Sequence, residues 1–106
     1  MKESAYQNSL IRRLEKEFPN CLVIKNDASY IQGIPDLLVL YGNKWAMLEV
    51  KRSYSDSVQP NQLYYVELLN SMSYASFIYP ENEERVFDEL QYAFRPSRKA
   101  RVPKPK

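Results

Sequence analysis

The chain has 106 residues, 44% of them apolar and 26% charged, with two glycines, one cysteine and no histidine. A chain of this length predicts one domain that buries about 60–70% of its unfolded surface. The lack of histidine excludes Ser–His and Cys–His catalysis and most zinc chemistry, and the single Cys21 excludes an internal disulfide. An enzyme built from this chain must therefore work with carboxylates, lysines or tyrosines, with or without a hard metal ion.

The charge is segregated along the chain. Residues 1–94 carry nine basic and thirteen acidic side chains, whereas residues 95–106 carry six basic and no acidic ones. With three prolines and few apolar side chains, residues 95–106 are expected to form a disordered tail behind a single domain at 1–94. The tail is either a solubilising extension or an arm that contacts nucleic-acid phosphates, and the sequence leaves both open.

The sequence shows neither a membrane segment nor a secretion signal. No apolar run approaches the roughly 20 residues that a membrane span needs, and the first residues, MKESAYQ, lack a signal-peptide core. We therefore expect a cytoplasmic protein that contacts no membrane, and a bacterial, archaeal or phage-type host is compatible with this.

Hydrophobic spacing predicts seven elements in the order αβββαβα, which indicates an α/β domain with helices on the faces of a sheet. In chain order these are a helix at 2–18, strands at 21–24, 35–41 and 44–51, a helix at 61–73, a strand at 75–79 and a last helix from Asn82, a plausible N-cap. The apolar positions of the first helix recur at steps of four, and those of the second at steps of three: Leu63, Val66, Leu69 and Met72.

Gly42-Asn43 between two apolar runs predicts a two-residue hairpin turn. If Tyr41 pairs with Lys44, Asp36 lies directly opposite Glu49. Two carboxylates about 5 Å apart repel by about 3 kcal/mol at an effective dielectric of 20. Protonation of one acid, a slipped register, or a cation between the acids would relieve this repulsion.

A divalent cation bound between the opposed acids would relieve their repulsion and give them a function. Asp36, Glu49 and the backbone carbonyl of Val50 could supply hard oxygen ligands, and Lys51 projects from the same face about 6.6 Å further along the strand. The simpler alternative is a strand-start acid at the rim of the sheet and a solvated Glu49–Lys51 pair. Glu3 continues the apolar stripe of the first helix, so it is either an acid favoured by the helix dipole or a third acid directed at the sheet.

The order of these motifs resembles the PD-(D/E)XK nuclease superfamily. Pro35-Asp36, a hairpin and Glu49-Val50-Lys51 follow a helix with an acid near its start. The detailed form, G-I-P-D-L and then E-V-K, is most similar to the VRR-NUC branch and to its relatives among the archaeal-type Holliday junction resolvases. That branch has an E-x-x-x-Q near its N-terminus, matched by Glu3 and Gln7, and a glutamine on the next helix, matched by Gln62.

The resemblance covers about residues 3–80 and implies a restriction-endonuclease-like αβββαβ core with a central mixed four-stranded sheet. The C-terminal helix and the basic tail are additions, and the hairpin is unusually compact. The compact hairpin and the basic tail are the two departures from the family pattern, and they leave the substrate open rather than the chemistry.

The resemblance also implies a set of roles. Asp36, Glu49 and the Val50 carbonyl would hold Mg²⁺ or Mn²⁺, with Glu3 joining through water, and no small-molecule cofactor is needed. The cation would activate a water and offset charge on the phosphate. Lys51 would position that water or stabilise the developing charge, and Gln62 would orient a phosphate or water.

The implied activity is metal-dependent hydrolysis of DNA phosphodiester bonds, selective for branched or four-way junctions, in DNA repair or recombination. A nonspecific or nicking nuclease, or an inactive nucleic-acid-binding module, remains an alternative. The resolvase relatives imply a homodimer. The expected phosphate contacts are basic side chains near the site and in the tail: Lys25, Lys44, Arg52, Arg95, Arg98, Lys99 and Arg101.

Four tyrosines, at positions 30, 54, 64 and 65, lie in or near loops that flank the predicted site. They could stack on unpaired bases. We expect at least half of them to pack in the core instead.

Overall fold

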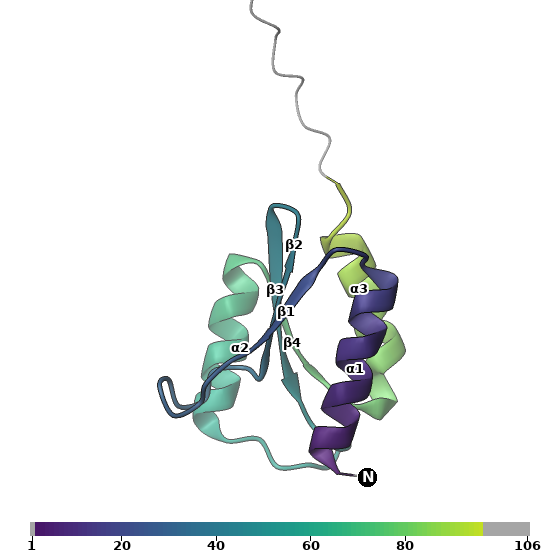
Figure 1. Ribbon diagram of the computed structural model, residues 1–106. Helices are drawn as coiled ribbons and strands as arrows, with labels where there is room; N and C mark the ends of the chain where they lie inside the picture. Colours follow the sequence, from purple (N-terminus) through teal and green to yellow (C-terminus); the bar gives the residue numbers. More distant parts are fainter. Residues whose placement is uncertain (1, 97–106) are drawn as a thin grey trace, which may run out of the picture.

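The computed structural model describes residues 2–96 and shows a mixed four-stranded sheet with helices on both faces (Figure 1). The elements are α1 (Glu3–Glu17), β1 (Leu22–Lys25), β2 (Leu37–Tyr41), β3 (Lys44–Val50), α2 (Pro60–Met72), β4 (Tyr74–Ile78), a 3₁₀ turn η1 (Pro80–Asn82) and α3 (Glu83–Ala93). The α/β class and the element order are confirmed, with boundaries within two residues of those predicted. Within residues 2–96, no helix has the length and apolar character that crossing a membrane requires. Arg98, Lys99 and Arg101 lie outside the described residues.

The sheet has the order β1-β2-β3-β4, with antiparallel pairs β1/β2 and β2/β3 and a parallel pair β3/β4. The hairpin register is the predicted one, since Tyr41 pairs with Lys44 and Leu37 with Leu48. Gly42 has a φ of +61°, a left-handed value that glycine adopts without strain and that a tight turn requires.

One face of the sheet carries the core, between the strands and the helices α1 and α3 (Figure 1). Alternate residues of β2 and β3 point to this face, as the period of a strand dictates. The fully buried side chains there are Leu37, Val39, Ala46, Leu48 and Val50, packed against Leu10, Leu14, Phe87 and Leu90. This layer fixes β3 in position, so the residues between its buried ones are held on the opposite face.

Helix α2 covers that opposite face, over β3 and β4 (Figure 1). Of the four apolar positions predicted for it, Val66 is buried, whereas Leu63 is 46% exposed and Met72 is 63% exposed. The physical reason is the helical period: a step of three residues falls about 60° short of a full turn, so three steps carry the stripe to the far side of the helix. Steps of exclusively three therefore do not define one buried face.

The first turns of α1 are anchored to the start of α3. The hydroxyl of Tyr6 donates to Glu83 at 2.8 Å, and the Arg13 guanidinium contacts Glu83 at 2.6 Å and Glu84 at 2.7 Å. These contacts set where Glu3, one turn before Tyr6, lies relative to the sheet.

Asn82 precedes α3 as predicted, but its side chain does not cap that helix. Its amide oxygen accepts from the N–H of Tyr79 at 2.8 Å, and its amide nitrogen donates to the carbonyl of Phe77 at 3.0 Å. The buried Asn82 side chain therefore holds the backbone that follows β4 in place through these two hydrogen bonds.

Candidate active site

Asp36 and Glu49 meet at the open end of the hairpin. The strand pairing ends at Leu37 and Leu48, and Asp36 and Glu49 are the next residues on the two sides of the hairpin. They are close enough for the Asp36 carboxylate to raise the pKa of Glu49. The N–H of Val50 donates to the Asp36 carboxylate at 2.9 Å, which fixes that carboxylate beside β3. The N–H and C=O of one strand residue point to the same side, so the carbonyl of Val50 also faces Asp36.

Glu49 and Lys51 are both nearly buried, with 4% and 7% of their surfaces exposed. The Lys51 ammonium donates to the carbonyl of Ser57 and to Oε1 of Gln62, each at 2.8 Å, and lies 3.9 Å from Oε2 of Glu49. The amide nitrogen of Gln62 donates to the same Glu49 oxygen at 3.0 Å. A solvated surface pair would show none of this burial, so the simpler alternative for Glu49 and Lys51 is wrong.

Gln62 links the acid to the lysine in a defined orientation. Its Oε1 accepts from Lys51 and also from the backbone N–H of Gln59 at 3.0 Å, so its amide nitrogen must face Glu49. The resemblance implied contact between Gln62 and a phosphate or water. The structure gives this side chain contacts with the two predicted catalytic groups, and its contact with a phosphate or water stays a prediction.

Burial and like charge raise the pKa values of the acids. Burial, followed by the nearby Asp36 carboxylate, raises the pKa of Glu49 to about 8, against a smaller lowering by Lys51. Burial also raises the pKa of Asp36, although the Val50 N–H and Lys51 oppose this. The pair therefore holds a proton near neutral pH unless another cation replaces it.

The donor set at this point fits a hard divalent cation. Mg²⁺ is usually bound by one or two carboxylates together with water and substrate phosphate oxygens. Asp36 and Glu49 supply two carboxylates, and the Val50 carbonyl faces the same place. Within residues 2–96, no three His, Cys, Asp or Glu side chains form a group able to hold a metal, so Glu3 is not a third direct ligand of such a group.

Glu3 lies on the rim of a cleft of about 480 Å³ that opens beside the pair. The cleft is lined by Lys2, Glu3, Lys51, Arg52, Asp56, Ser57, Gln59 and Gln62. Partial burial and the nearby Asp36 raise the pKa of Glu3. Lys2 and Ser57 were missed from the sequence. Lys2 could have been found from its position next to Glu3. The contact of Ser57 with Lys51 uses a backbone carbonyl, which every residue has, so no sequence pattern predicts it.

The backbone conformation and the close packing at position 33 require a glycine in the loop before Asp36. The φ of Gly33 is +94°, and a Cβ built there would lie 2.8 Å from Cγ of Asn61. The loop thus packs closely against the first turn of α2, directly beside Gln62. This contact ties the loop that delivers Asp36 to the helix that delivers Gln62.

The predicted phosphate-binding side chains fall into two groups at opposite ends of the sheet. Lys25 and Arg52 lie at the end that carries the site, since Asn26 donates to the carbonyl of Asp36 and Arg52 lines the cleft. Lys44 begins β3, seven residues and about 23 Å along the strand from Lys51. Arg95 lies near Phe18 and Tyr41, also at the end of the hairpin turn. Lys44 therefore does not join the local patch around Lys51 that we expected.

The expectation that at least half of the four tyrosines pack in the core is wrong. Tyr30 is 85% exposed, Tyr54 is 77% exposed, and Tyr64 is exposed on α2, while Tyr65 is half-buried. The reason is local: Tyr30 and Tyr54 lie in polar loops, and α2 buries only Val66.

Comparisons with models of protein families, with curated proteins and with solved structures found no match to this chain. The resemblance to the PD-(D/E)XK superfamily therefore stands on the motif residues and on what their geometry can do.

Proposed function

We propose that this protein is a metal-dependent endodeoxyribonuclease with a restriction-endonuclease-like core, of the VRR-NUC and Holliday junction resolvase-like branch of the PD-(D/E)XK superfamily. The observation that carries the proposal is the opposed pair Asp36 and Glu49, with the nearly buried Lys51 held beside it by Gln62. Neighbouring acids shielded from solvent raise each other's pKa unless a cation lies between them. The cleft beside them also carries three cationic side chains, with Glu3 and Asp56 as its two acids, so it offers contacts to a phosphate once a metal offsets the acids.

The roles follow from the contacts. Asp36, Glu49 and the Val50 carbonyl would hold Mg²⁺ or Mn²⁺, which when bound acidifies water and neutralises charge on a phosphate. The Lys51 ammonium has three N–H groups, and Ser57 and Gln62 take two of them. The third is available for a phosphate oxygen or the attacking water. Lys2 and Arg52 on the cleft wall would contact flanking phosphates.

The test is incubation with four-way, flap, nicked and linear duplex DNA in Mg²⁺, Mn²⁺ or EDTA. We expect cleavage of branched DNA that requires the cation and is lost in Asp36→Asn, and no loss in Asp88→Asn, a matched exposed acid on α3. Equal cleavage of linear duplex would favour the nonspecific or nicking alternative. DNA binding without cleavage in any cation would favour the inactive binding module.

We further propose that two copies assemble, because a four-way junction presents two symmetric strands. Apolar side chains remain exposed on the α2 side of the sheet: Leu22, Ile24, Leu63, Tyr64 and Met72. A second copy would cover them. Light scattering should show a dimer that Leu63→Lys dissociates, and a monomeric wild type at high concentration would contradict this.

A further inference from the structure

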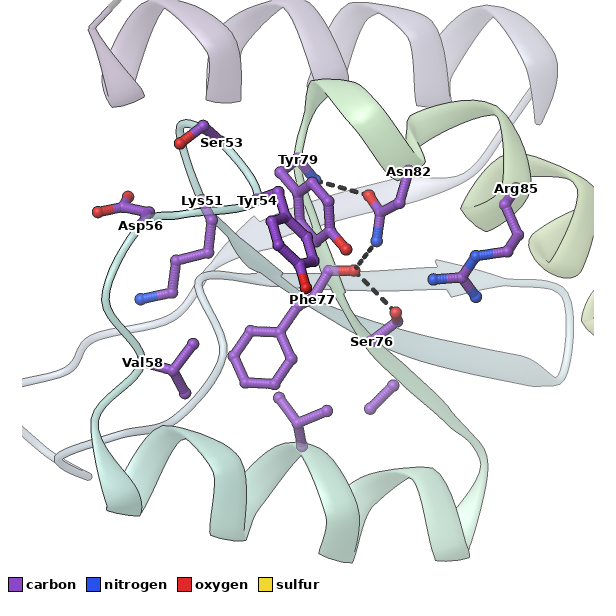
Figure 2. A pocket seen from close by; sticks show the side chains of 12 residues that line it. Lys51, Ser53, Tyr54, Asp56, Val58, Ser76, Phe77, Tyr79, Asn82 and Arg85 are labelled. Carbon is purple, nitrogen blue, oxygen red and sulfur yellow. Dashed lines mark hydrogen bonds between the residues drawn. The ribbon is translucent and has the colours of Figure 1, made fainter.

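A second cavity, of about 320 Å³, adjoins the candidate active site. Lys51 and Asp56 line both spaces, and residues 52–58 form a wall of each. The second cavity extends from this loop across β4 to the start of α3 (Figure 2). None of the roles assigned above uses it.

The walls of this cavity are aromatic and apolar, with a cation at one side. Figure 2 shows the rings of Tyr54 and Tyr79 next to each other, with Phe77 beside them and Arg85 at the far side. The Tyr54 and Tyr79 ring centroids lie 6.0 Å apart at 65°, so the two rings form a corner rather than a closed stack. Tyr54 is mostly exposed and so can admit a ring against its face.

The charged and polar groups of the cavity are largely committed elsewhere. The amide of Asn82 is used by Phe77 and Tyr79, as described above. The Asp56 carboxylate accepts from the N–H groups of Arg52 and Ser57 and pairs with the Arg52 guanidinium at 3.5 Å. The Arg85 guanidinium pairs with Glu89 at 3.0 Å. The cavity therefore offers mainly stacking surfaces, bordered by the Arg85–Glu89 pair and by Lys51, rather than a fixed array of donors and acceptors.

Size and chemistry together identify the ligand class. A space of about 300 Å³ is at the lower end for small-molecule sites, and it suits one planar ring system rather than a peptide or a duplex. Aromatic rings with a nearby cation bind nucleobases through their π-faces without regard to sequence. Because Lys51 borders both spaces, a phosphate in the cleft would place an adjoining base at the mouth of this cavity.

We propose that the cavity binds one unpaired nucleobase next to the scissile phosphate. This inference rests on the proposed nuclease function, and it narrows the substrate to DNA with an unpaired nucleotide at or beside the branch. A paired base would first have to be unstacked and unpaired, which costs a few kcal/mol that an already unpaired base does not require.

The test uses the full chain in EDTA with DNA that carries 2-aminopurine, unpaired at a branch point or paired with thymine at the same position. Wild-type protein should change the fluorescence of the unpaired probe and bind that DNA at least fivefold more tightly than the paired form. Tyr54→Ala should lose about five- to tenfold in affinity for the unpaired DNA, the lower part of the range for one stacked base. Tyr54→Phe retains the ring and should stay within twofold of wild type.

An abasic nucleotide at the probe position provides the decisive control. With no base to stack, wild type and Tyr54→Ala should bind equally. If Tyr54→Ala weakens binding of abasic and paired DNA as much as that of unpaired DNA, or if the unpaired probe does not respond, the inference is overturned.

Adding Mg²⁺ or Mn²⁺ separates this inference from the proposed function. If the cleavage rate is the same for unpaired and paired DNA, and the same in wild type and Tyr54→Ala, the protein is a nuclease but the cavity does not bind a base. If the probe responds in a Tyr54-dependent way but no DNA is cleaved, the cavity binds a base and the proposed nuclease function is wrong.

Discussion

Glu49→Gln should remove most of the pH dependence of stability in the metal-free protein between pH 6 and 8. Glu49 has a folded-state pKa of about 8 against an ordinary value of 4.5, because burial and Asp36 disfavour its charge. The folded state therefore binds more protons than the unfolded state in this window. The contribution of Glu49 to the free energy of unfolding is therefore fully present below pH 4.5, and it is lost as the pH rises through 8.

The magnitude follows from the linkage relation. One proton retained on folding changes the free energy of unfolding by about 1.4 kcal/mol per pH unit below the folded pKa, and the slope falls to half at that pKa. Between pH 6 and 8 the loss is about 2 kcal/mol. The chain has no histidine, and burial raises the pKa of the Cys21 thiol above its ordinary 9.0, so no imidazole or thiol contributes to the fall in this window. The other acids with raised pKa values at the site are Asp36 and Glu3, and Asp36 titrates together with Glu49 as a pair.

Urea denaturation in EDTA at pH 6, 7 and 8 measures the effect. Wild type and Glu67→Gln, an exposed acid on α2, should show the same fall, and Glu49→Gln should be nearly flat. A flat wild-type profile, or an unchanged slope in Glu49→Gln, would refute the account of this acid pair. Because a bound cation displaces the proton, Mn²⁺ affinity measured by calorimetry should rise up to about tenfold per pH unit over the same window.

Three further predictions concern single parts of the site. Lys51→Met should lower the single-turnover cleavage rate by about 10²–10³-fold while Mn²⁺ still binds, and retained cleavage would remove Lys51 from the mechanism. Gly33→Ala should lower the free energy of unfolding by about 3 kcal/mol, through its φ of +94° and the close approach of Asn61, whereas Gly42→Ala, with open space around its Cβ, should cost about 1 kcal/mol; equal losses in urea denaturation would contradict the packing argument. Removal of the tail at 95–106 should weaken DNA binding and flatten its dependence on salt, without changing the cleavage rate at saturation; an unchanged salt slope would show that the tail does not contact the DNA.

The hairpin was predictable because its two signals agree. Gly42-Asn43 between two apolar runs sets a two-residue turn, and that loop length sets the register from Tyr41–Lys44 to Leu37–Leu48, so the placing of Asp36 across from Glu49 follows by counting. The period of two also places residues 46, 48 and 50 on one face of β3 and residues 47 and 49 on the other, as the structure shows.

The parts that could not be predicted depend on contacts distant in sequence. The link from Gln62 to Glu49 and Lys51 requires the position of α2 over β3, which no local pattern specifies. Leu63 and Met72 were misplaced because apolar character alone does not show which side of α2 meets the sheet. The separation of Lys44 from Lys51 could have been predicted from the length of the strand between them. The prediction missed it because it grouped the two lysines by charge alone.

The two-residue turn at Gly42 has a consequence for how this domain tolerates change. A one-residue insertion there that moved the pairing by a single step would turn Glu49 toward the core and bring Leu48 and Val50 out beside Asp36. Such a chain would lose its acid pair and its packing in the same event. Length changes at 27–32 of the preceding loop, before Gly33 and Asp36, leave both the β3 pattern and the approach of Gly33 to Asn61 untouched. Natural variation in length should therefore accumulate in that loop and be excluded from the hairpin tip.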